Sequence, residues 1–156
     1  MNENERFPVI FNYGEEVDGG KLMEDLKFLL NRKIEVTRSI VIPSFGSDES
    51  VTIGDGTVGI TVPSDINGWR LIKVLSSIET PSSSGTIDIQ IRRARKGVDT
   101  DLLTTKVTIS ANDYFAEDGI IDNDERIVKT GDIIFADIDL AGSGALGLFT
   151  VLTFKE

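Results

Sequence analysis

The sequence predicts a mainly β protein, an antiparallel jelly-roll-like β-sandwich with one N-terminal helix. From about residue 36 to residue 154, short apolar segments alternate with polar residues at a period of two. Turn sequences rich in glycine, proline and serine separate these segments at the spacing of sandwich strands. Only one stretch, near the N-terminus, has helical periodicity. Strand therefore follows strand without helical crossovers, which favours antiparallel sheets.

The N-terminal part differs from the rest, and we divide the chain into an anchor, residues 1–43, and a β-sandwich domain, residues 44–156. Residues 7–11 are apolar, and Pro8 removes one ladder hydrogen bond, which suits an edge strand or a docking arm. Residues 21–33 carry apolar side chains at the spacing of an amphipathic helix. The alternative is that this helix only covers an open face of the sandwich. The residues expected to contact a partner or another copy are Phe7, Val9, Phe11, Leu22, Leu26 and Leu29.

The remaining sequence is interpreted as strands and turns. Residues 86–93 alternate most clearly, with isoleucine at every second position facing the core. Residues 54–56, Gly-Asp-Gly, form a strong turn signal. The charged residues 95–101 and the acidic residues 112–124 are expected to be loops. The expected strands span residues 36–42, 51–53, 58–62, 69–80, 86–93, 102–110, 132–140 and 146–154.

The composition argues against several classes of function. The chain of 156 residues has no cysteine and no histidine, which excludes disulfides, thiolate nucleophiles and Ser-His-Asp sites. We therefore expect no enzyme, no cofactor and no metal site. The net charge of −10 repels a phosphate backbone, so we expect no nucleic-acid partner. The apolar runs are too short to cross a bilayer and the N-terminus lacks the pattern of a secretory signal, so we expect no membrane partner and folding in a cytoplasm.

One basic cluster, residues 92–96, interrupts this acidic sequence. We expect Arg92 and Arg93 to meet an acidic patch on a partner protein or on a neighbouring subunit. The alternative is a strand end whose long side chains lie along the surface of their own chain.

Three further groups of residues have a functional and a purely structural interpretation. The acidic residues 117–125 suit a calcium ion by their oxygen ligands, or form a solvated loop. Asp137 and Asp139 are about 7 Å apart along one strand, a spacing that glycoside hydrolysis can use, although exposed alternating acids are usual on a sandwich. Aromatic residues could form a sugar-stacking surface or fill the core. These aromatic residues are Tyr13, Trp69, Tyr114 and Phe115.

Six segments within about residues 50–156 share a further pattern of strands and turns. They are residues 58–63 (VGITVP), 67–71 (NGWRL), 87–93 (IDIQIRR), 101–105 (DLLTT), 130–132 (TGD) and 147–154 (GLFTVLTF). This pattern resembles a module common among structural proteins of tailed bacteriophages. Proteins of this kind are virion parts, namely capsid decoration or cement proteins, head fibres and tail-fibre domains, and they are often trimers.

The resemblance implies a non-enzymatic phage virion protein. The first expectation is a homotrimeric capsid decoration, cement or head-fibre protein that attaches through its N-terminal arm. Its partners would be its own copies and the major capsid protein or another virion protein, and assembly would take place in the bacterial host cytoplasm. The alternative is a tail-associated receptor-binding domain that contacts a cell-surface glycan. A carboxylate-based hydrolase is a third hypothesis from another class.

Overall fold

The computed structural model describes residues 19–31 and 35–156, which belong to two compact units. Met1–Glu35 is the unit that contains the helix, and Val36–Glu156 is the unit that contains every described strand. The sandwich thus begins before the predicted boundary at residue 44, because β1 (Thr37–Pro43) pairs along its whole length with the last strand. No helix among the described residues is long and apolar enough to cross a membrane.

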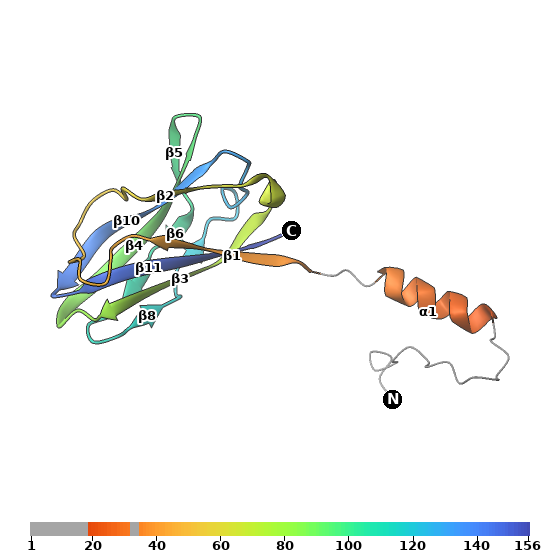
Figure 1. Ribbon diagram of the computed structural model, residues 1–156, viewed down its shortest axis with the longest axis horizontal. Coiled ribbons are helices and arrows are strands. Elements are labelled where there is room, and N and C mark those ends of the chain that lie inside the picture. Colours follow the sequence, from red (N-terminus) through yellow and green to blue (C-terminus); the bar gives the residue numbers. More distant parts are fainter. Residues whose placement is uncertain (1–18, 32–34) are drawn as a thin grey trace. The chain divides into compact units, whose positions relative to one another are not determined.

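The β unit is built from eleven strands, several of them short, and Figure 1 shows them as two overlapping layers. A short 3-10 helix, η2 (Ser64–Ile66), lies between β2 and β3. The remaining elements are α1 (Gly19–Asn31), β2 (Gly59–Thr61), β3 (Arg70–Thr80), β4 (Ser84–Arg95), β5 (Val98–Asp101), β6 (Leu103–Thr105), β7 (Val107–Ile109), β8 (Phe115–Ala116), β9 (Ile120–Ile121), β10 (Ile133–Ser143) and β11 (Leu146–Lys155).

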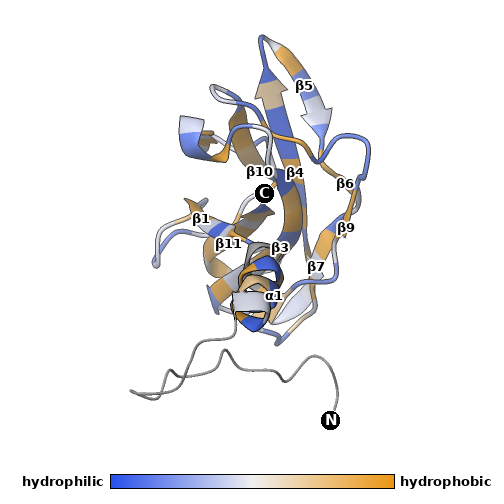
Figure 2. Ribbon diagram, turned by 90° about the vertical axis from the view of Figure 1, so that its right-hand side faces the viewer, coloured by the Kyte–Doolittle hydropathy of each residue, from blue (hydrophilic) through white to orange (hydrophobic). Residues whose placement is uncertain are grey.

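The strands pair in a nested and antiparallel order. The first strand, β1, pairs with the last, β11, and β2 pairs with β10. Further inward, β3 pairs with β8, and β4 pairs with β5 and β7. The resulting sheets have the orders β1-β11-β3-β8 and β2-β10-β4-β5. Figure 2 shows β10 and β4 in one layer, and β11 and β3 in the other. A double ribbon rolled up in this way is a jelly roll, so the predicted fold is confirmed.

The core lies between the two sheets and follows the period of two. The alternate isoleucines of β4, Ile87, Ile89 and Ile91, are fully buried. Leu148 and Leu152 of β11 are buried in the same way. Because every second residue of a strand points inward, these strands supply one buried side chain per pair of residues.

Two bulges move residues away from the face that strict alternation assigns to them. Strict alternation places Leu140 on the same face as Ile138, but Leu140 is exposed because the pairing of β10 with β4 shifts between them. A second shift, between β11 and β3, places Leu71 and Val74 both in the core and leaves Ile72 exposed. A bulge inserts one unpaired residue, so the inward series resumes one residue later.

The region after β4 also differs from the prediction. The expected loop at residues 95–101 is a hairpin, in which Lys96 (φ 51°) and Gly97 (φ 80°) form a left-handed turn that brings β5 back onto β4. The next expected strand is interrupted where β6 leaves the sheet to pair with β9. The side-chain amide of Gln90 bridges this gap by donating to the Leu103 carbonyl (3.0 Å) and accepting from the Leu103 N–H (3.2 Å).

Candidate interaction surfaces

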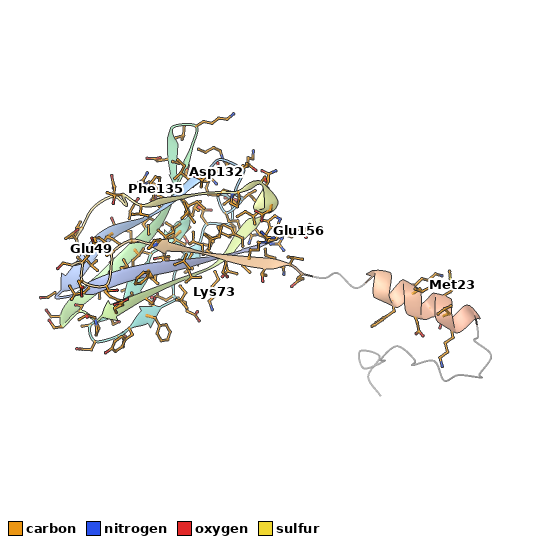
Figure 3. The ribbon with its side chains drawn as sticks, in the orientation of Figure 1. Met23, Glu49, Lys73, Asp132, Phe135 and Glu156 are labelled. Carbon is orange, nitrogen blue, oxygen red and sulfur yellow. The ribbon has the colours of Figure 1, made fainter. Side chains whose placement is uncertain are left out.

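The helix α1 presents the predicted apolar stripe to solvent. Leu22 and Leu26, both predicted contact residues, are 38% and 44% exposed, and Met23 and Phe28 are exposed as well. Figure 3 shows the Met23 side chain projecting from the helix. A helix of 13 residues is marginally stable in water on its own, and helices of this length usually gain stability by packing an apolar stripe against another surface.

The other predicted contacts at the N-terminus lie outside the described part of the chain. This holds for Phe7, Val9 and Phe11 of the expected arm, and for Tyr13. The backbone of Leu29 belongs to α1, whereas its side chain lies outside what the structure describes. The expectations for these residues stay predictions.

Arg92 belongs to a network within its own chain. Its Nε donates to Asp137 Oδ2 (2.7 Å), and Nη2 donates to Asp137 Oδ1 (3.2 Å). Its Nη1 donates to Asp99 Oδ2 (3.0 Å). The guanidinium also lies 4.6 Å from the centre of the Phe135 ring. The hydrogen bonds to Asp137 raise the pKa of Arg92, more than burial lowers it. This arginine therefore fixes β10, β4 and β5 together.

Arg93 points the opposite way, into the end of the core, where it is 4% exposed. Its Nη1 donates to the Glu125 carbonyl (2.5 Å) and to the Ile127 carbonyl (3.1 Å), and its Nη2 donates to Glu125 Oε2 (2.6 Å). Both arginines are thus bonded to groups of their own chain, and the expectation that they meet a partner stays a prediction.

Arg95 and Asp132 form a further ion pair at the same end of the sandwich. Two bonds join them, Nε to Oδ1 (2.8 Å) and Nη2 to Oδ2 (2.7 Å), and the Lys129 N–H donates to Oδ2 as well (2.8 Å). Burial of Asp132 by itself raises its pKa, but the hydrogen bonds from Arg95 and Lys129 outweigh burial and lower the pKa. Sequence reasoning missed this pair, although its acid, Asp132, belongs to the motif Thr-Gly-Asp at residues 130–132.

The acidic residues 117–125 do not converge on one point. Glu117 pairs with Lys73 on β3 (2.5 Å), and Asp118 accepts the Thr108 N–H (2.9 Å). Glu125 is the partner of Arg93. In the described ranges, 19–31 and 35–156, no group of three or more acidic residues is placed to hold a metal ion.

The acid pair that spacing suggested for hydrolysis is divided between two networks. Asp137 is 8% exposed and holds Arg92, and it also accepts the Gly56 N–H (2.7 Å). Asp139 is half exposed and pairs with Lys106 (2.9 Å), a contact that raises the pKa of Lys106. Each carboxylate thus has its own cation.

The aromatic residues separate into two groups. Trp69 is partly buried and packs against the core. Tyr114 and Phe115 are 59% and 61% exposed, on and beside β8. Trp69 therefore packs with the core, as one of the two interpretations expected, whereas Tyr114 and Phe115 do not.

A hollow of about 210 Å³ lies beside the segment between β1 and β2. The sequence predicted a strand at residues 51–53, but the segment forms isolated bridges with the sheets instead of a ladder, one of which joins Gly54 to Ile138. A side chain at Gly56 would collide with the backbone of Ala136, so the segment lies tightly against β10. The hydroxyl of Ser44, on the wall of the hollow, is buried without a hydrogen-bond partner.

Comparison with known proteins adds little to this geometry. No family model matches the sequence, and no curated protein matches it significantly. Among solved structures, the crystal structure of murine APRIL at pH 8.5 is similar, with 12% sequence identity and a TM-score of 0.42 over 76% of this chain and 98% of that one. Similarity at this level does not assign the chain to a family, and the jelly roll follows from the strand pairing itself.

Proposed function

We propose that the chain is a non-enzymatic structural protein of a tailed-bacteriophage particle. In this proposal it is a homotrimeric capsid decoration, cement or head-fibre protein. Its N-terminal arm and helix attach it to the major capsid protein or to another virion protein, and the jelly roll is displayed. The resemblance of the sandwich sequence to phage virion modules supports the setting, and the structure of the helix supports the mode of action.

The observation that carries the proposal is the exposed apolar stripe of α1. A short helix with this stripe gains its stability by packing against other helices or against a partner surface. The leucines at positions 22, 26 and 29 are spaced by four and three residues, which is the spacing of a coiled-coil seam. Association of several copies through α1 buries these leucines.

The proposal that the protein is not an enzyme is supported by the state of its acids. Histidine and cysteine are absent from the sequence. A carboxylate that acts as a general acid needs a raised pKa and a free path to substrate. Asp132 has a lowered pKa instead, and Asp137 is closed off by Arg92 and Gly56.

The test has two parts. Light scattering measures the oligomeric state of the purified protein, and electron microscopy with a label on this protein locates it on the virus particle. Wild-type protein is expected to be a trimer at micromolar concentration and to be found on the particle by electron microscopy. Leu26→Asp places a charge in the stripe and is expected to dissociate the trimer, while the sandwich keeps its circular dichroism spectrum. Deletion of residues 1–35, which removes the helix unit alone, is expected to abolish incorporation. A wild-type protein that stays monomeric at high concentration contradicts the proposal.

The alternative function, a receptor-binding domain on the tail, is favoured by one observation. The hollow beside the β1–β2 segment combines an aromatic side chain, Phe45, with a carboxylate, Asp55, and hydroxyl groups. Sugars are commonly bound by such combinations of ring faces and hydrogen-bonding groups. Binding of host glycans on an array, lost in Phe45→Ala, would support this alternative.

A further inference from the structure

We infer that the outer face of the sheet β1-β11-β3-β8 is a second self-association surface, on which the sandwich contacts another copy of this chain. The inference rests on the proposed self-assembly and names the surface of the β unit that takes part in it. We call this surface the outer apolar face. It consists of Val41, Pro43, Leu75, Phe115, Phe149 and Val151.

The strand register brings these residues into two adjacent rows across the sheet. The first row comprises Pro43, Phe149, Ser77 and Phe115. The second row comprises Val41, Val151 and Leu75. Directly paired residues of antiparallel strands point to the same side of a sheet. The neighbours Thr150 and Leu152 are fully buried, so Phe149 and Val151 lie on the outer side.

The exposed fractions show that this face is uncovered in the described part of the chain. Val41 is 50% exposed and Phe115 is 61% exposed. Phe149, Val151 and Leu75, which lie between them on the central strands, are partly exposed. Tyr114, next to Phe115, is 59% exposed as well.

The opposite outer face, on β10 and β4, has a different character. It carries the ion pairs Arg92–Asp137 and Lys106–Asp139. Even its aromatic ring, Phe135, is in contact with the Arg92 guanidinium. Figure 3 shows Phe135 on the β10 side of the sandwich and Lys73 on the β3 side. The apolar character of the β1-β11-β3-β8 face is therefore a property of that face and not of the whole surface.

Charge favours a second copy as the occupant of the outer apolar face. Two copies of a chain with a net charge of −10 repel one another, so a contact between copies meets the least repulsion at a surface without net charge. At the rim of this face, Lys73 is neutralised by Glu117. The six residues of the face are all uncharged, so the face offers no cations to bind an acidic partner. A partner that covers it must therefore have an apolar surface of its own. Every further copy of the chain brings the same face.

The size of the face indicates that it acts together with the helix. Four strands spaced about 4.8 Å apart and two rows spaced about 7 Å apart cover on the order of 300 Å². A stable interface takes about 800 Å² from each partner. The face alone is therefore too small to hold two copies together, and it contributes once the helices have brought the copies near.

The test uses the full chain and four single substitutions to glutamate or aspartate. Phe115→Glu and Val41→Glu place a charge on the outer apolar face at exposed positions, so the fold is expected to survive. Val98→Glu is the matched control, because Val98 is 65% exposed on β5 of the other sheet. Leu26→Asp reports on the helix. Sedimentation equilibrium measures the association constant of each variant, and thermal unfolding verifies the fold.

Phe115→Glu and Val41→Glu are each expected to weaken association by at least about tenfold, as the loss of one well-buried contact does, and Val98→Glu to leave it unchanged. If Leu26→Asp dissociates the oligomer while both face variants associate like wild type, the outer apolar face is not a self-contact and only the proposed function stands. The inference also fails if the face variants associate normally but are lost from particles, since another virion protein then covers the face. A wild-type protein that never associates removes both proposals.

An independent measurement uses the absence of cysteine from the sequence. Phe115→Cys introduces a single thiol on the outer apolar face, and Val98→Cys introduces one on the control surface. Mild oxidation is expected to give a disulfide-linked dimer for Phe115→Cys, with little for Val98→Cys. Equal yields for the two variants would contradict the inference.

Discussion

Replacement of Arg93 by methionine separates a structural arginine from a partner contact. Methionine matches the length of the arginine stem and continues the apolar row on β4, but it donates no hydrogen bond. The main loss is the bond to the Glu125 carbonyl, because the Ile127 carbonyl also accepts from Arg95 (2.9 Å) and the Glu125 carboxylate is 41% exposed to water. Removal of the guanidinium also removes its buried Nε, which has no partner. We estimate a net destabilisation of about 2 kcal/mol, which corresponds to roughly 8 °C in melting temperature for a domain of this size.

Urea unfolding followed by circular dichroism measures this destabilisation, and light scattering of the same samples measures the oligomeric state. Lys129→Met is the control, because it removes one positive charge from an exposed position close in sequence to Glu125 and Ile127, the residues whose carbonyls accept from Arg93. Arg93→Met is expected to lower the unfolding midpoint with the oligomer unchanged, and Lys129→Met to change neither. If Arg93→Met kept the stability of wild type and lost assembly, the assignment of Arg93 to the core would be refuted.

Two further predictions concern the polar groups that hold the sandwich together. Folding lowers the pKa of Asp132 from its ordinary value of 3.8, so its ion pair stabilises the protein fully above that value and less as the pH falls through the folded pKa. The difference in unfolding free energy between wild type and Asp132→Asn should therefore shrink as the pH is lowered from 7 to about 2. Parallel curves of unfolding free energy against pH for the two proteins would contradict this. The buried hydroxyls of Ser76 and Thr150 bond to each other (2.9 Å), so Thr150→Val alone should cost about 1–3 kcal/mol while Ser76→Ala added to it recovers most of the loss. Additive losses in urea unfolding would argue against the shared bond.

The alternation of apolar and polar residues made much of the fold predictable, because a half-buried strand must repeat with period two. The same period of two also predicts that Arg93 points inward. The treatment of residues 92–96 as one basic cluster overlooked this. Arg93 continues the inward series of Ile87, Ile89 and Ile91, whereas Arg92 belongs to the outward series. Neighbours along a strand point to opposite sides of the sheet. Arg92 and Arg93 therefore cannot form one patch, although they are adjacent in the sequence.

Other features depend on pairings that alternation does not encode. Val41 meets Val151 because the first and last strands pair, and nothing in the local sequence of either strand specifies that partner. The bulges that expose Ile72 and Leu140 are likewise set by the register with a neighbouring strand. The one local signal for the outer apolar face was β11, whose residues are largely apolar at both odd and even positions. A strand of this kind has both faces covered, or has one face available for a partner.

The two proposed surfaces suit each other because each is insufficient alone. A 13-residue helix and a patch on the order of 300 Å² each give weak association. Both surfaces belong to the same chain. Once the helices of two copies meet, this covalent connection raises the effective concentration of the outer apolar faces, so the second contact costs less entropy. The acidic charge elsewhere on the chain opposes contacts through any other surface. Assembly should therefore be steep in concentration, and loss of either surface should lower it far more than the buried area of that surface suggests.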